Sequence, residues 1–159
     1  MFLFSLRPVG NADAEFICRL MNEPSALAAL RELPTPLSLW EEAIPEWDAD
    51  PDEEDFILLS NGEPAGWLGV NGLADALPYI KMLVLLPEYR HMGLGAAAVK
   101  ETLRLLKDRG FARAALYTDE DNRSARHCYE KCGFAVTEHL TEEMADGSIA
   151  ARVRMEVIL

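Results

Sequence analysis

The stretch "PEYRHMGLGAAAVKE", residues 87–101, decides how this sequence is read, because it sets two glycines one residue apart where a helix begins. A glycine costs a helix about 1 kcal/mol relative to alanine. Backbone N–H groups at a helix start are unpaired and carry partial positive charge, so they attract phosphate. Glycines let the backbone approach such an anion closely. The stretch therefore indicates a phosphate-binding helix start, and a glycine-rich helix entry without a ligand is the structural alternative.

Two other phosphate motifs fit the stretch less well. A P-loop requires Gly-Lys followed by Ser or Thr, which is absent here. The run Gly93–Ala98 matches the Gly-x-Gly-x-x-Ala variant of a dinucleotide fold. In that fold the first glycine directly ends a strand, whereas residues 87–90 intervene here. Too little chain also follows for a second half and a substrate site.

The elements predicted around this stretch have the order of a mixed α/β domain. Strands are predicted from apolar runs and alternation, and helices from apolar spacing of three and four residues. Asn61-Gly62 predicts a tight hairpin turn, and Pro45 is expected to interrupt the second helix. The predicted strands are 2–9, the hairpin 55–72, 78–86, 111–118, 134–140 and 151–159, and the predicted helices are 11–23, 37–47, 93–109 and 122–133.

Composition favours one domain over residues 1–159, since half of the residues are hydrophobic. The net charge of −12 argues against nucleic acid and anionic membranes as partners. Residues 1–80 hold 3 basic and 15 acidic residues, most densely at 46–55. No apolar run approaches the roughly 20 residues of a membrane span, and the start lacks a basic leader. Three cysteines without zinc or disulfide spacing predict no metal site and a reducing cytoplasm.

Two segments together resemble the GNAT superfamily of N-acetyltransferases. "LVLLPEYRHMGLGAAAV", residues 83–99, is similar to its acetyl-CoA-binding segment, since Arg90, Gly93 and Gly95 match the pattern Arg-x-x-Gly-x-Gly. "NRSARHCYEKCGF", residues 122–134, resembles the second signature of that family. The resemblance covers about residues 73–140, and residues 11–55 resemble no particular member. It implies a single-domain α/β fold with a mixed central sheet of about seven strands, splayed central strands and about four flanking helices.

The resemblance also implies acetyl-CoA as co-substrate and assigns residues to its site. The pyrophosphate would lie on the backbone of residues 91–96, and the pantetheine arm would pair with the strand before it. Tyr129 would be the catalytic residue that protonates the departing thiolate, and a backbone N–H near Leu85 would hold the oxyanion. The predicted cofactor-binding residues are Leu83, Val84, Leu85, Arg90, His91, Met92, Gly93, Leu94, Gly95, Ala96, Asn122 and Ala125.

The general base and the acceptor are less defined by the sequence. Some family members carry a glutamate on the central strand, where this chain has Tyr79 and Lys81. Glu120, Glu138, a water chain and an amine that arrives already deprotonated are alternatives, and none is assigned. The acidic residues between 41 and 55 fall where the family builds a wall of the acceptor site. We therefore expect a cationic small-molecule amine as acceptor, with a protein N-terminus, a lysine or a coenzyme A sensor without turnover as alternatives. Acyl groups longer than acetyl and a homodimer also fit.

Overall fold

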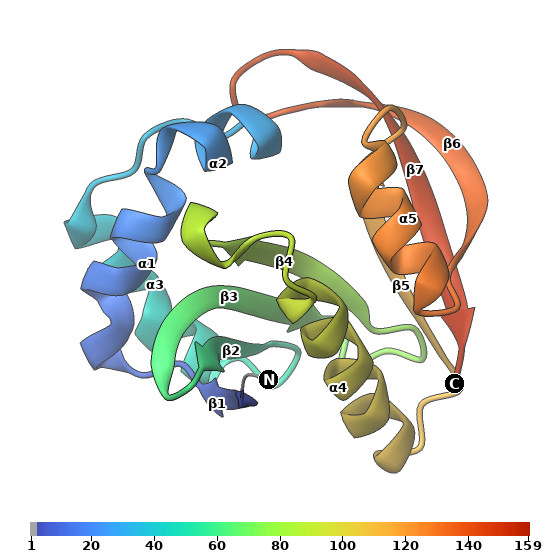
Figure 1. Cartoon of the computed structure of the whole chain (residues 1–159), viewed down its shortest axis with the longest axis horizontal. Coiled ribbons are helices and arrows are strands. Elements are labelled where there is room, and N and C mark those ends of the chain that lie inside the picture. The colour runs from blue at the N-terminus through green and yellow to red at the C-terminus, as the bar shows by residue number, and fades with distance from the viewer. Residues whose placement is uncertain (1–2) are drawn as a thin grey trace.

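The computed structural model describes residues 3–159 and places seven strands in one mixed sheet of order β1-β2-β3-β4-β5-β7-β6 (Figure 1). Phe2, the first residue of the predicted N-terminal strand, lies outside the described residues. All neighbouring strands pair antiparallel except β4 and β5, which are parallel. The expected seven-stranded mixed sheet is confirmed. The strands are β1 (Phe4–Pro8), β2 (Glu54–Ser60), β3 (Glu63–Asn71), β4 (Tyr79–Leu85), β5 (Arg113–Asp119), β6 (Ala135–Glu143) and β7 (Ile149–Ile158).

Residues 3–159 contain five α-helices, one more than the sequence predicted. The unexpected helix is α2, only seven residues long, which starts with Pro24 and is capped by the Glu23 carboxylate accepting from the N–H groups of Ser25 and Ala26. Two short 3-10 turns occupy 11–13 and 87–89. The helices are α1 (Ala14–Met21), α2 (Pro24–Leu30), α3 (Leu37–Ala49), α4 (Leu94–Asp108) and α5 (Arg123–Lys131).

Helix α3 continues through Pro45, so the expected interruption there is wrong. Proline removes one backbone hydrogen bond from a helix interior, at a cost of about 3 kcal/mol. Both halves of α3 are held by aromatic packing that offsets this cost. Trp47 stacks on Trp67 of β3 at 5.0 Å between ring centroids, and Trp40 meets Trp67 edge to face at 6.0 Å.

The two faces of the sheet bury separate apolar clusters. Neighbouring residues of a strand point to opposite faces, and β2 shows this directly. Ile57 packs with residues of α1, α2 and α3, whereas Leu58 packs with residues of α4. Helices α1–α3 therefore cover one face of β2–β4, and α4 covers the other. Figure 1 shows α1 and α3 on the left and α4 in front of the sheet.

The central strands β4 and β5 separate soon after they meet. Their pairing is limited to Tyr79 with Ala115 and Ile80 with Leu116. Beyond these pairs β4 stays on β3 and β5 stays on β7. A bulge between Gly69 and Val70 shifts the β3–β4 register by one residue at the point of divergence, and bulges bend strands in this way. The expected splayed central strands are confirmed.

Candidate active site

A cavity of about 770 Å³ fills the gap between the diverging strands. Its walls are residues 80–85 of β4, residues 116–119 of β5, the start of α4, one side of α5 and the end of α2. The splay leaves backbone N–H and C=O groups on the facing edges of β4 and β5 without strand partners. Buried backbone groups need hydrogen bonds, so an extended ligand between the strands would satisfy them. We call this cavity the cleft.

The two glycines face open space of the cleft. Gly93 has a positive φ of 86° as the N-cap of α4, and a Cβ added to it would meet no atom within 4 Å. A Cβ on Gly95 would meet only side-chain atoms of Leu83 and Leu85, both at 4.0 Å. The left-handed backbone favours glycine at position 93, whereas neither backbone conformation nor protein packing accounts for the missing side chain of Gly95. The α4 N-terminus with its unpaired N–H groups offers an anion site where they stand.

Arg90 lines the cleft and fastens the glycine loop to two other elements. Its Nε donates to the carbonyl of Leu85 at 3.1 Å, which ties the loop to the end of β4. Its guanidinium also donates to Ser25 Oγ at 2.7 Å and pairs with Glu23 at 3.4 Å, which ties the loop to the start of α2. The arginine of the motif is thus a structural clamp as well as a cation in the cleft.

The structure brings most of the predicted cofactor residues into this cleft. Met92 and Leu94 are the two that do not line it: the Met92 side chain is 44% exposed and the Leu94 side chain is fully buried in the core. The predicted residues that line the cleft are Leu83, Val84, Leu85, Arg90, His91, Gly93, Gly95, Ala96, Asn122 and Ala125.

Tyr129 also lines the cleft, from α5. Its ring meets Phe134 edge to face at 6.1 Å, which orients it against the core. Burial raises the pKa of Tyr129 to about 12, with a further contribution from the neighbouring thiols of Cys128 and Cys132. The phenol therefore stays protonated near neutral pH and can act as a donor. Asn122 caps α5, because its Oδ1 accepts from the N–H of Ala125 at 3.1 Å.

The outer end of the cleft holds polar residues that the sequence did not single out. Asp119 ends β5 and accepts from Arg152 of β7 at 2.8 Å and from Arg31, just after α2, at 3.2 Å. Glu32 follows Arg31 and lines the same cavity. Burial, together with repulsion from Asp146, raises the pKa of Glu32. The suggested bases Glu120 and Glu138 do not line the cleft, nor does Tyr79.

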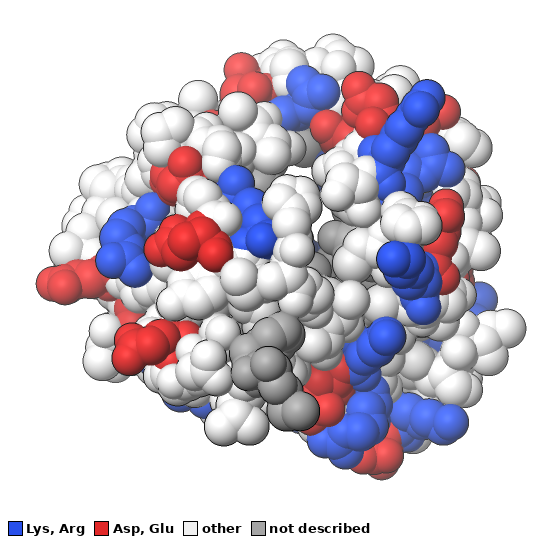
Figure 2. Space-filling view, viewed as in Figure 1, with Lys and Arg blue, Asp and Glu red and all other residues white. Residues whose placement is uncertain are grey.

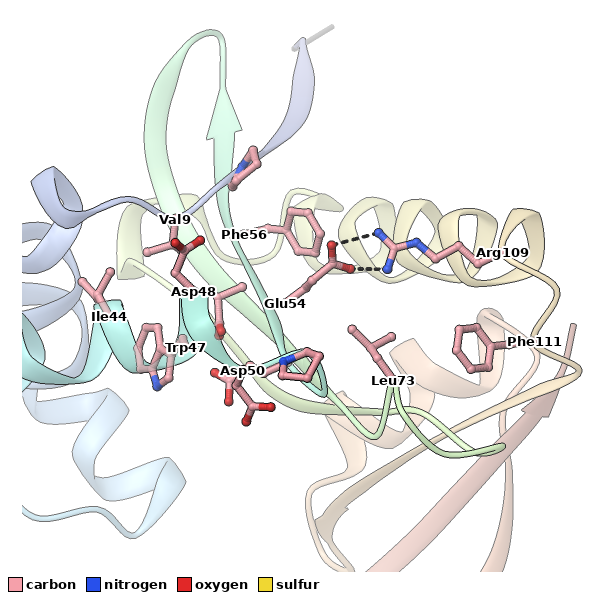
Figure 3. Close-up of a pocket in the computed structure, with 14 residues that line it drawn as sticks. Val9, Ile44, Trp47, Asp48, Asp50, Glu54, Phe56, Leu73, Arg109 and Phe111 are labelled. Carbon is pink, nitrogen blue, oxygen red and sulfur yellow. Dashed lines mark hydrogen bonds and ion pairs between the residues drawn. The ribbon is translucent and has the colours of Figure 1, made fainter.

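The carboxylates between residues 41 and 55, expected as a wall of the acceptor site, do not line the cleft. Glu53 pairs with Lys81, Asp55 accepts from Trp67 Nε1 at 2.8 Å, and Glu54 pairs with Arg109. These carboxylates lie around a second hollow of about 500 Å³ beside the start of β2, which also has aromatic walls (Figure 3). They act in local pairs because β2 begins within the acidic run and turns alternate carboxylates inward. Figure 2 shows acidic and basic side chains interspersed on the face that it presents.

Residues 3–159 hold neither a membrane-spanning helix nor a cluster of metal-ligating side chains. No helix in this part of the chain is both long and apolar enough to cross a membrane. No three of its histidine, cysteine, aspartate and glutamate side chains gather as a metal site would require.

Comparison with known proteins agrees with this geometry. The family model described as "Acetyltransferase (GNAT) family" matches residues 19–134. A mycothiol acetyltransferase of Corynebacterium efficiens is 39% identical over 87 residues, which are 54% of this chain and 29% of that protein. A spermidine N(1)-acetyltransferase of Escherichia coli K12 is 28% identical over 162 residues, 94% of this chain and 83% of that protein.

The solved structures show the same fold. The spermidine N-acetyltransferase of Vibrio cholerae, crystallised with CoA and spermine, superposes with a TM-score of 0.87 at 22% identity, covering 98% of this chain and 95% of that one. The family model spans most of the chain, and this match is sufficient to assign the chain to a family. The chain belongs to the GNAT family of acetyltransferases.

Proposed function

We propose that this chain transfers the acetyl group of acetyl-CoA to a primary amine of a cationic small molecule. The observation that carries the proposal is the cleft between β4 and β5, which ends at the glycine-rich start of α4. One continuous cavity thus joins an anion site to an unpaired strand edge, the two features that a diphosphate with an amide-containing arm requires.

The residues present fit coenzyme A. His91, Gly93 and Gly95 leave room for a diphosphate on the α4 N-terminus, with Arg90 beside it. The β4 edge over residues 83–85 would pair with the amides of the pantetheine arm in the manner of an added strand. When bound, acetyl-CoA supplies a thioester carbonyl that an amine can attack.

Tyr129 would supply the proton in this reaction. The amine nitrogen forms a bond to the thioester carbon and loses a proton to water, and the carbon–sulfur bond then breaks with both electrons leaving on sulfur. A phenol that stays protonated at neutral pH can donate a hydrogen bond or a proton to that sulfur. The phenol regains from water the proton that it gives to sulfur. General-acid catalysis of this kind typically raises the reaction rate by about 10² to 10⁴. A backbone N–H of the free β4 edge near Leu85 would hold the negative oxygen.

The acceptor class is supported by the relatives and by the outer end of the cleft. A relative that this chain matches over 83% of its length is named for spermidine, a polyamine. Glu32 places a carboxylate in the same cavity. We further propose that residues 1–159 act as one domain in the cytoplasm. The predicted homodimer would use the exposed edge strand β6.

Thiol release tests the proposal against its rivals. Purified protein with acetyl-CoA should release thiol in the presence of a polyamine or another cationic amine. A basic peptide with a free N-terminus and lysine tests the protein-acceptor alternative. A coenzyme A sensor would show a thermal shift with coenzyme A and no thiol release with any amine.

A further inference from the structure

Two carboxylates line the cleft, and they differ in how they are neutralised. Asp119 is bridged by two arginines, Arg31 at 3.2 Å and Arg152 at 2.8 Å. Glu32 forms no ion pair within 4.0 Å among residues 3–159, although its backbone N–H is bonded to the carbonyl of Leu27 at 3.1 Å. The backbone of Glu32 is therefore held in place, and its carboxylate lines the cavity without an ion-pair partner among the described residues.

The charged groups around Glu32 leave it in need of a cation. Asp146, on the turn between β6 and β7, repels it, and burial adds to the rise in the pKa of Glu32. Three cations of the cleft are paired with other carboxylates, since Lys81 pairs with Glu53, Arg90 with Glu23, and Arg152 with Asp119 and Glu142. Lys131 also lines the cleft and forms no ion pair with Glu32 within 4.0 Å. A partly buried carboxylate is costly when unpaired, and an ammonium group from the ligand would offset that cost.

Glu32 follows helix α2 in the chain and lies at a different end of the cleft from Tyr129. Arg31 has a positive φ of 55° at the end of α2, and its side chain reaches Asp119, the last residue of β5. Its carbonyl also accepts from Asp146 N–H at 3.1 Å. These contacts hold Glu32 at the outer end of the cleft, next to the end of β5.

Tyr129 belongs to the inner end of the cleft. It packs on the core cluster that contains Leu116, where β4 and β5 part. Asp119 lies three positions after Leu116 in β5, and a strand rises about 3.3 Å per residue, so these two positions lie about 10 Å apart along the strand. An acceptor whose amine reacts near Tyr129 would carry a second ammonium group to Glu32 only if its chain spans that distance.

We propose that Glu32 binds the second, non-reacting ammonium group of the acceptor, and so selects aliphatic polyamines over monoamines. This inference rests on the proposed acetyltransferase function and assigns the recognition element within the same cleft. Glu32 is a specificity-determining residue here and takes no part in bond making.

Kinetics with the variant Glu32→Gln test this role. Spermidine and butylamine serve as polyamine and monoamine probes at saturating acetyl-CoA. A hydrogen bond to a charged group contributes enough that its loss lowers kcat/KM about ten- to hundredfold. We expect that loss with spermidine and no change with butylamine. The thermal shift caused by coenzyme A should persist, since Glu32 lies outside the predicted cofactor residues.

Glu63→Gln is the matched control, because Glu63 is an exposed carboxylate in the β2–β3 hairpin, outside both cavities. It should behave as the parent protein with both amines. Calorimetric titration of spermidine into the coenzyme A complex should show the same weakening for Glu32→Gln as the kinetics. An equal loss with both amines, or no loss with spermidine, overturns the role of Glu32 while the proposed function stands. A parent protein that binds coenzyme A and acetylates neither amine overturns both.

Discussion

Replacing Tyr129 by phenylalanine removes one hydroxyl from the cleft and leaves the ring against Phe134. The pKa of Tyr129, raised to about 12 mainly by burial, lies about 3.5 units above the ordinary thiol value of about 8.5. Complete proton transfer to a thiolate is therefore uphill by about 5 kcal/mol, so the phenol assists mainly by hydrogen bonding. We expect kcat to fall about 10²-fold, at the lower end of general-acid effects.

The assay is thiol release with saturating acetyl-CoA and a polyamine, measured from pH 6 to 10, a window of about two units on either side of an ordinary thiol pKa. The phenol stays protonated throughout this window. The pH profiles of the parent protein and the variant should therefore have the same shape, with a lower kcat for the variant at every pH. Tyr79→Phe is the control, since Tyr79 pairs β4 with β5 and does not line the cleft. Full activity of the Tyr129 variant would refute the proton-donor role and make Tyr129 a core aromatic.

Three further predictions concern cofactor binding and stability. Gly95→Val should remain folded and lose the coenzyme A thermal shift, which for a ligand at 100 times its Kd is worth about 2.7 kcal/mol, or about 5–10 °C; a retained shift would argue against the glycine loop as the binding site. Gly69→Ala places a Cβ 2.6 Å from Asp55 Oδ1 and from Lys81 Cε, so urea denaturation should show a loss of about 1–3 kcal/mol. Gly10→Ala, with nothing closer than 4.0 Å, should show no such loss. Burial, with the nearby Glu53 carboxylate, raises the pKa of Asp55 to about 8, so the native state binds a proton that the unfolded state releases near pH 4. The contribution of Asp55 to stability is therefore present below about pH 4 and lost as pH rises to about 8, and Asp55→Asn should flatten that decline; an unchanged slope would contradict the raised pKa.

The elements that sequence predicted well are those with local signals. Asn61 and Gly62 both take positive φ in the β2–β3 turn, as a two-residue hairpin requires. The glycine loop and the α5 signature lie within short stretches, so their residues could be named in advance. The splay of β4 and β5 came from the family resemblance, since apolar patterning carries no information on where two strands part.

The elements that sequence missed depend on long-range contacts. Arg31 and Asp119 are 88 residues apart in the chain, and their pairing decides that Glu32 faces the cleft. Residues 11–55 resemble no particular member of the family in sequence, although the family model reaches back to residue 19, so nothing local marked that pairing. The acidic stretch was expected to form a wall of the acceptor site because of its charge density and its place in the family pattern, and neither of these shows which way a side chain points. The alternation of Glu53 and Asp55 at the start of a strand was the signal that both carboxylates turn toward Lys81.

The most direct test of the account follows both products of one reaction. Purified protein is mixed with acetyl-CoA and spermidine, and N-acetylated amine is measured by mass spectrometry beside free thiol. We expect the two products to appear in equal amounts and the Tyr129→Phe variant to slow the formation of both together. Thiol without acetylated amine would mean hydrolysis, and neither product in the presence of bound acetyl-CoA would contradict acetyl transfer in the cleft.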